Sequence, residues 1–171
     1  QMKTRARLLA AAALLVLLAL ITTPASARLV REWTYDELRD ESELIAIDTP
    51  TARKELPDKT TLPGIFKQTK TDRESIEAIQ VETTFKVIST LKGRIEPGKD
   101  ADKKNEFILY HMIESKPDLS TDGPDLVDFK PDSKKTYLMY LKKRPDGRYE
   151  ATNGNTDPAT SIKELVASPT P

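Results

Sequence analysis

The residue spacing most suggestive of chemistry lies in an acidic turn that has the pattern of half a calcium-binding loop. In the segment KPDLSTDGPDLVDF, residues 116–129, the side chains of Asp118, Ser120 and Asp122 place oxygens at the first, third and fifth loop positions. Gly123 follows, where a sharp turn is needed. Calcium binds about six to eight oxygens, but the twelfth position, normally a bidentate glutamate, is a phenylalanine here. We therefore interpret the segment as a solvated acidic turn leading into a strand DLVDF, with Asp118, Ser120 and Asp122 as an incomplete calcium site.

Other groups that could carry catalysis or bind a metal are scarce. The chain has no cysteine, and His111 is its only histidine. This composition excludes thiol catalysis and metal sites made of thiolates or of several histidines. It also excludes a Ser-His-Asp triad with any base other than His111. In the predicted strand 107–113, His111 shares a face with apolar residues, which favours a core or rim histidine over a catalytic one. We expect no catalytic residue and no cofactor.

The N-terminal segment has the order of regions that is typical of a secretory signal peptide. Three basic residues precede the fourteen-residue apolar run 8–21, and the small-residue string TTPASA follows it. An uncleaved membrane anchor is the alternative, but fourteen residues fall short of the roughly 20 that a spanning helix needs. We predict a signal peptide over residues 1–27, cleaved between Ala27 and Arg28, and a periplasmic or secreted mature protein with no membrane attachment.

Composition limits the class of the mature chain. From Arg28 on, 24 basic and 27 acidic residues give a net charge of −3, with the two signs interleaved. That balance provides no electrostatic reason to bind nucleic acid or anionic lipid. Because there is no cysteine, packing alone must stabilise the fold. The length suits one domain over residues 28–167, followed by a disordered tail at 168–171.

Residue periodicity predicts a mainly β protein with one short N-terminal helix. The helix, residues 35–42, begins at a capping box in which Thr34 and Glu37 bond to each other's backbone. The predicted strands are 44–48, 81–92, 107–113, 137–143 and 148–152, with 161–166 as a short strand or a helical turn. The tight-turn sequence PDG joins two of them into a hairpin. Five or six strands around one core favour a small antiparallel OB-like β-barrel, and a two-sheet β-sandwich is the alternative.

One long stretch has no sustained period. Residues 54–75 contain two prolines and a glycine, which is typical of a loop. Twenty-two residues is long for a loop inside a compact domain. We predict a mobile surface excursion there, or else a functional loop.

Several strings in order along the mature chain resemble a family of small, exported, uncharacterised bacterial proteins. The strings are LVREWTYDEL at 29–38, LKG at 91–93, GPDLVDFKP at 123–131, YLMYLKKRPDGRY at 137–149, and TDP at 156–158 followed by SIKEL. The resemblance spans most of the mature chain and implies a common fold, but no activity, cofactor or catalytic residue. The strand order is also similar to the OB-like barrel of netrin and metalloproteinase-inhibitor modules. Those inhibitors act through an N-terminal cysteine, which this chain lacks, so only the fold transfers.

These observations favour a non-catalytic exported domain. We expect it to bind a protein, a glycan or a small ligand in the cell envelope, because barrels of this kind commonly present loops and a concave face to ligands. The alternative is an envelope hydrolase that uses paired carboxylates. The chain's 27 acidic residues supply so many possible pairs that no single pair is informative.

Overall fold

A closed ring of strands is the main feature of the chain. The computed structural model describes residue 31 and residues 33–68, 72–95, 105–115 and 125–166. The predicted signal peptide at 1–27 and the predicted tail at 168–171 lie outside these residues. Among these residues, none of the helices has the length and hydropathy of a membrane-spanning segment.

The described elements follow one another in an order dominated by strands. They are α2 (Tyr35–Glu41), β1 (Leu44–Gln68), β2 (Arg73–Lys92), β3 (Glu106–Glu114), the 3-10 turn η2 (Pro131–Ser133), β4 (Thr136–Lys143), β5 (Tyr149–Ala151), the 3-10 turn η3 (Pro158–Thr160) and β6 (Ile162–Leu165). This mainly β content with one short helix confirms the prediction.

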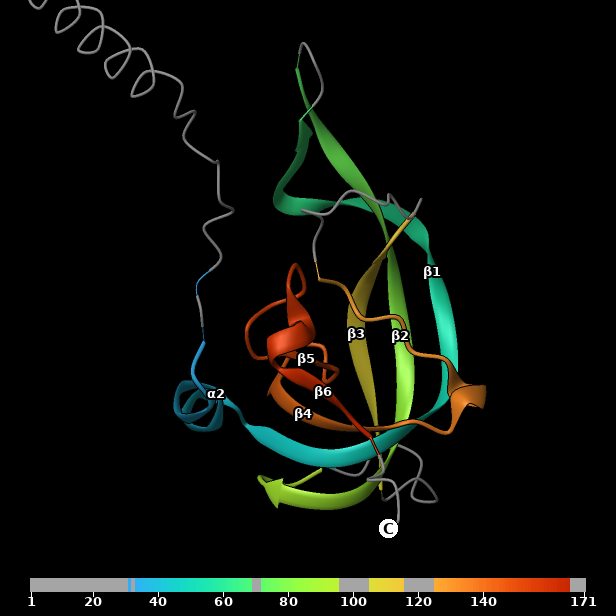
Figure 1. Ribbon diagram of the computed structural model, residues 1–171. Coiled ribbons are helices and arrows are strands. Elements are labelled where there is room, and N and C mark those ends of the chain that lie inside the picture. The colour runs from blue at the N-terminus through green and yellow to red at the C-terminus, as the bar shows by residue number, and fades with distance from the viewer. Residues whose placement is uncertain (1–30, 32, 69–71, 96–104, 116–124, 167–171) are drawn as a thin grey trace, which may run out of the picture. The chain divides into compact units, whose positions relative to one another are not determined.

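The sheet closes on itself, as Figure 1 shows. Its strand order is β1-β2-β3-β5-β4-β6, and an additional pairing of β1 with β4 completes a ring of five strands. All pairings are antiparallel except that of β3 with β5, which is parallel and has one residue pair, Leu109 with Tyr149. The predicted small β-barrel is therefore confirmed, and the sheet does not split into two packed sheets.

Helix α2 begins as its sequence predicts. The Thr34 hydroxyl accepts a hydrogen bond from the Glu37 backbone N–H at 3.2 Å, and Glu37 Oε2 accepts one from the Thr34 N–H at 2.9 Å. Leu38, one residue further on, is fully buried, and the helix lies against β4. The capping box thus fixes where the helix starts, and Leu38 attaches it to the barrel.

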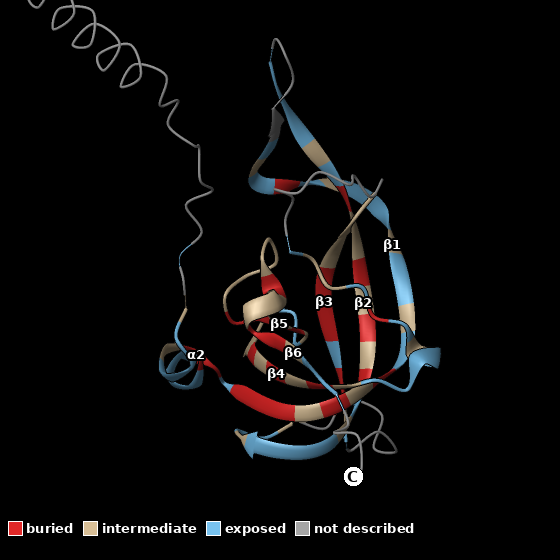
Figure 2. Cartoon of the chain, viewed as in Figure 1, coloured by how far each residue is buried: buried red, intermediate tan, exposed pale blue. Residues whose placement is uncertain are grey.

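The prediction of a loop over residues 54–75 is wrong. β1 continues through this region to Gln68, and β2 begins at Arg73, so the two strands form a long hairpin whose outer end is mainly exposed (Figure 2). The register between the strands shifts around Pro57 and again around Pro63 and Gly64. The prolines and the glycine, which has φ +71°, therefore lie in bulges, where a missing donor or a positive φ is tolerated.

The prediction of a strand at DLVDF is also wrong. Residues 125–130 have no strand pairing, yet Phe129 is fully buried among the core side chains. Its ring packs edge-on against Phe85, Tyr137 and His111, with centroids 5.0, 5.1 and 4.9 Å away. The apolar pattern of this segment thus reflects the insertion of Phe129 into the core rather than hydrogen bonding to a neighbouring strand. We call residues 125–135 the strap, because in Figure 1 they run past β3 and β2 to η2 and back to β4.

The hairpin of β4 and β5 is as predicted. Leu141 pairs with Ala151 and Lys143 with Tyr149, around a turn in which Gly147 has φ +88°. On β4, alternate residues are buried, and the same strand pairs with β1 on one side and with β5 and β6 on the other. β4 is therefore a central strand, and its inward face belongs to the barrel core.

Candidate functional site

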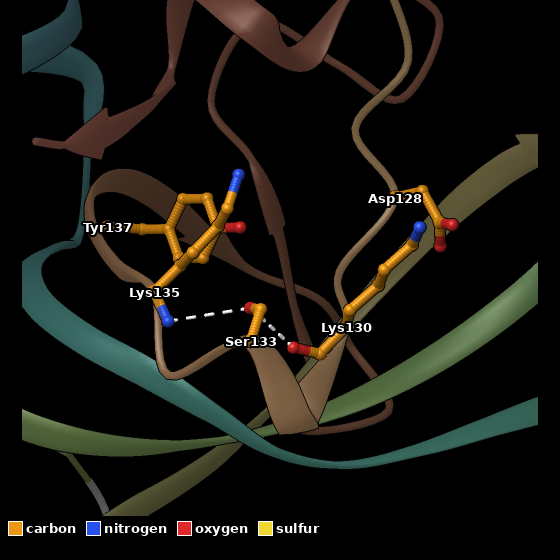
Figure 3. A pocket seen from close by; sticks show the side chains of 5 residues that line it. All are labelled: Asp128, Lys130, Ser133, Lys135 and Tyr137. Carbon is orange, nitrogen blue, oxygen red and sulfur yellow. Dashed lines mark hydrogen bonds between the residues drawn. The ribbon is translucent and has the colours of Figure 1, made fainter.

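A pocket lies where the strap meets β4. Its volume is about 290 Å³, and its lining residues are Asp128, Lys130, Ser133, Lys135 and Tyr137 (Figure 3). We call it the Tyr137 pocket. Four of the five lining residues belong to the strap, and Tyr137 is the second residue of β4, so a turn and a strand end together form the pocket.

Local hydrogen bonds fix the shape of the strap around η2. Pro131 occupies the first turn, and the Ser133 hydroxyl donates to the Lys130 carbonyl at 2.7 Å. The Lys135 backbone N–H donates to the Ser133 hydroxyl at 3.4 Å. Between them, Lys134 has a left-handed backbone, with φ 53°. In Figure 3 the Lys130 and Lys135 side chains consequently stand on opposite sides of Ser133.

Most charges at the pocket are already compensated. Asp128 pairs with Arg53 at 3.0 Å, and Lys135 pairs with Glu164 at 2.7 Å. No carboxylate among the described residues lies within ion-pair distance of the Lys130 ammonium. The Arg53 guanidinium is shared, because it also pairs with Glu55 at 2.8 Å, so the charges of the lining and its ion-pair partners balance overall.

Tyr137 contributes the end of its side chain to the pocket. Only 4% of the residue is exposed, because its ring packs against Phe129 at 5.1 Å and Phe85 at 6.5 Å. No hydrogen bond joins its hydroxyl to another residue of the described part of the chain. Burial, followed by the negative charge of Glu164, raises the pKa of Tyr137 above its ordinary value. The phenol therefore stays protonated near neutral pH and can donate a hydrogen bond.

A buried acid lies beside Tyr137. Asp48 on β1 faces Tyr137 in the β1–β4 register and is 0% exposed. Neither of its carboxyl oxygens has a hydrogen-bond partner among the described residues. Burial raises the pKa of Asp48 to about 8, so the group is mainly protonated at neutral pH. Asp48 does not line the pocket.

His111 also lies inside the barrel. It is 2% exposed, and its Nε2 atom is 2.9 Å from the Thr83 hydroxyl, while Nδ1 has no partner in the described part. Burial, and secondarily the charge of Arg53, lower the pKa of His111 to about 3, so the ring is neutral. His111 was predicted to lie in the core or at its rim, and its burial places it in the core.

The arrangement provides donors for binding rather than a nucleophile with a base. Two of the lining residues, Lys130 and Tyr137, carry side-chain donors that have no partner among the described residues. Among the described residues, no group of three or more His, Cys, Asp or Glu side chains could hold a metal ion. The candidate calcium residues Asp118, Ser120 and Asp122 lie outside the residues that the structure describes.

Sequence reasoning missed the pocket and the buried acid. The strap residues were not distinguishable from an ordinary polar turn, because their convergence depends on where the strap meets β4. A signal for Asp48 was present: the alternation in LIAID places it on the same face as Leu44 and Ala46, which are both fully buried. Comparison with protein-family models and with curated proteins finds no match for this chain.

Proposed function

We propose that this protein is a non-catalytic domain that binds a small ligand in the Tyr137 pocket. The observation that carries the proposal is the combination of a pocket of about 290 Å³ with two donors, on Lys130 and Tyr137, that have no protein partner in the described chain. Small-molecule sites typically combine a concavity with a few polar groups that fix the ligand's orientation.

The same geometry supports binding over hydrolysis. Glycoside hydrolysis by paired carboxylates needs two of them, separated by roughly 5 to 10 Å, on either side of the scissile bond. Only one carboxylate, that of Asp128, lines the pocket, and Arg53 already engages it. Asp48 and His111 are closed off from solvent, so neither can act as an acid or base on a ligand there. A hydrolase remains the alternative that the test below addresses.

The size of the pocket bounds the ligand and its affinity. A volume of about 290 Å³ corresponds to about ten waters at roughly 30 Å³ each. A ligand of about ten non-hydrogen atoms, each contributing roughly 0.3 to 0.5 kcal/mol, would bind with about 3 to 5 kcal/mol. That range corresponds to a dissociation constant of about a millimolar.

The proposed setting is the cell envelope. It rests on the order of regions in residues 1–27, which is typical of a cleavable signal peptide. The resemblance to small exported bacterial proteins and to the OB-like barrel of netrin modules agrees with a periplasmic or secreted binding domain. An N-terminus at Arg28 in protein purified from its native cell, measured by mass spectrometry, would support this setting, and retention of residues 1–27 would contradict it.

The binding proposal is tested by nuclear magnetic resonance titration of the purified protein with a panel of small neutral and charged metabolites. We expect at least one compound to shift the backbone amides of residues 130–137 in a saturable manner. A parallel screen with glycoside and ester substrates should show no turnover. Turnover that disappears in Asp128→Asn would instead favour the hydrolase alternative, and an unresponsive set of amides would contradict binding in this pocket.

A further inference from the structure

We propose that residues 47–49 of β1 form a hinge controlled by the protonation of Asp48: the protonated acid keeps the hinge closed, and the carboxylate opens it to water. We call these residues the Asp48 hinge. The hinge lies beside the Tyr137 pocket but needs no ligand, so it is independent of the proposed function. Three features of the molecule support it: the position of Asp48 in the sheet, its missing hydrogen-bond partners, and the absence of a charged partner among the described residues.

Asp48 lies where the pairing of β1 is interrupted on both sides. On the β4 side it belongs to the last residue pair, because Leu44–Asp48 pair with Leu141–Tyr137 and the pairing then ends. On the β2 side the register shifts between Ile47 and Asp48. From Thr49 onward β1 pairs with no described strand other than β2, and Figure 2 shows that it is mostly exposed there. Register shifts disrupt strand pairing locally, and its ends open at a lower free energy than its interior, so β1 can separate from β4 here while the barrel stays folded.

A carboxylate is not stable inside the closed hinge. Asp48 is 0% exposed, and neither of its carboxyl oxygens has a hydrogen-bond partner among the described residues. Burying an isolated charge without partners is far less favourable than burying the neutral acid. Loss of the proton therefore requires access to water. Opening at the end of the β1–β4 pairing gives that access with the fewest broken contacts.

No charged side chain of the described residues replaces water as a partner for the carboxylate. Tyr137 faces Asp48 from β4, and the apolar Val87 faces it from β2. The charged groups that act on Tyr137 belong to the strap and to β6, and they are Asp128, Lys135 and Glu164. None of them forms an ion pair with Asp48. Burial is accordingly the one cause of the raised pKa of Asp48.

The pH at which the hinge opens follows from the two environments of Asp48. Burial raises the pKa of Asp48 from 3.8 to about 8, and water in the open hinge restores the ordinary value. Each unit between the two values is a factor of ten in the ratio of closed to open protein, so the protonated protein is closed by a factor of about 10⁴. The two forms are then equally populated at about pH 8, and at pH 9 the open form exceeds the closed form about tenfold.

Opening of the hinge changes one wall of the Tyr137 pocket. Tyr137 is the residue paired with Asp48, and the Thr49 hydroxyl donates a hydrogen bond to the Lys135 carbonyl at 2.9 Å. Both Tyr137 and Lys135 line the pocket. The hinge therefore couples the pH to the shape of the pocket, which is intact below about pH 8 and altered above it.

The experiment measures the solvent exposure of methyl groups in the ligand-free wild-type protein by nuclear magnetic resonance. A neutral paramagnetic probe dissolved in the buffer speeds the relaxation of methyl groups that water can approach. Between about pH 6.5 and 9, this effect on the Val87 methyls should rise severalfold, with a midpoint at about pH 8. Val81 is the matched control, because it lies on the same strand, is 0% exposed and pairs with His111 on β3. Its methyls should stay protected, and Asp48→Asn should remove the rise at Val87.

Three outcomes would overturn the hinge. Titration of the Asp48 carboxyl carbon without a change at Val87 would show that the acid ionises inside a closed barrel. An equal rise at Val87 and Val81 would assign the exposure to unfolding of the whole barrel. A rise that persists in Asp48→Asn would assign the opening to another group. If this variant does not fold, the wild-type comparison still decides, because the midpoint at Val87 must match that of the Asp48 carboxyl carbon.

Discussion

Two buried titratable groups should make the stability of this protein depend on pH in opposite directions. Burial raises the pKa of Asp48 from 3.8 to about 8, so the folded protein holds this proton more tightly than the unfolded chain does. The associated stability is fully present below about pH 4 and is lost as the pH rises through 8. Burial lowers the pKa of His111 from 6.5 to about 3, so that its contribution is fully present above pH 6.5 and is lost as the pH falls towards 3.

The expected changes in the free energy of unfolding follow from the overlap of the pH ranges in which Asp48 and His111 titrate. Each group changes the free energy of unfolding by about 1.4 kcal/mol per pH unit inside its window. Between about pH 4 and 6.5 the two slopes have opposite signs and cancel. Between pH 6.5 and 8 only Asp48 still titrates, so we expect a loss of about 2 kcal/mol over that interval. Tyr137, the neighbour of Asp48 across β1 and β4, has a raised pKa and titrates above this window.

The perturbation that isolates these contributions is Asp48→Asn, which keeps the shape of the protonated acid but cannot ionise. The variant should not lose stability between pH 6.5 and 8. Because His111 then acts alone, its free energy of unfolding should rise by about 3 kcal/mol between pH 4 and 6.5. Urea unfolding followed by far-UV circular dichroism at pH 4, 6.5 and 8 measures both differences. His111→Gln is the reciprocal variant and should leave only the decline that Asp48 causes.

The slope of the free energy of unfolding against pH tests whether Asp48 is protonated in the folded protein, even if Asp48→Asn lowers stability at every pH. A buried amide with unpaired donors has its own cost, which does not depend on pH. Parallel curves for the wild type and the variant between pH 6.5 and 8 would mean that Asp48 is not held protonated inside the barrel. The reasoning from its burial and missing partners would then be wrong.

Three further predictions concern the strap, the turns and the ion pairs. Phe129→Ala should lower the free energy of unfolding in urea by about 3 to 5 kcal/mol, and a loss below about 1 kcal/mol would contradict its role as a core residue. Gly93→Ala should destabilise more than Gly64→Ala in the same assay: both residues have positive φ, but only at Gly93 would a Cβ atom meet the backbone of Glu43. Arg148→Ala should cost about 1 kcal/mol in low salt and less in 1 M sodium chloride, and an effect insensitive to salt would assign the loss to packing instead.

Local signals in the sequence were sufficient for some elements of the fold. The capping box of Thr34 and Glu37 and the turn around Gly147 involve residues close together in the chain, and both were predicted correctly. The prolines of residues 54–75 were misleading, because the bulges that accommodate them depend on the register between β1 and β2. The strap was misleading for a similar reason, since Phe129 is buried by contacts with β2, β3 and β4 rather than by a strand of its own.

The proposed site depends on a contact between residues that are distant in the chain. The pairing of β1 with β4 closes the ring, and it places Asp48 opposite Tyr137. Closure buries the acid, which raises its pKa to about 8, and it packs the Tyr137 ring against Phe85 and Phe129. The acid beside Tyr137 is therefore mainly protonated near neutral pH. Burial thus keeps Asp48 and His111 away from acid–base chemistry at the pocket, which is why we favour a binding function over a catalytic one.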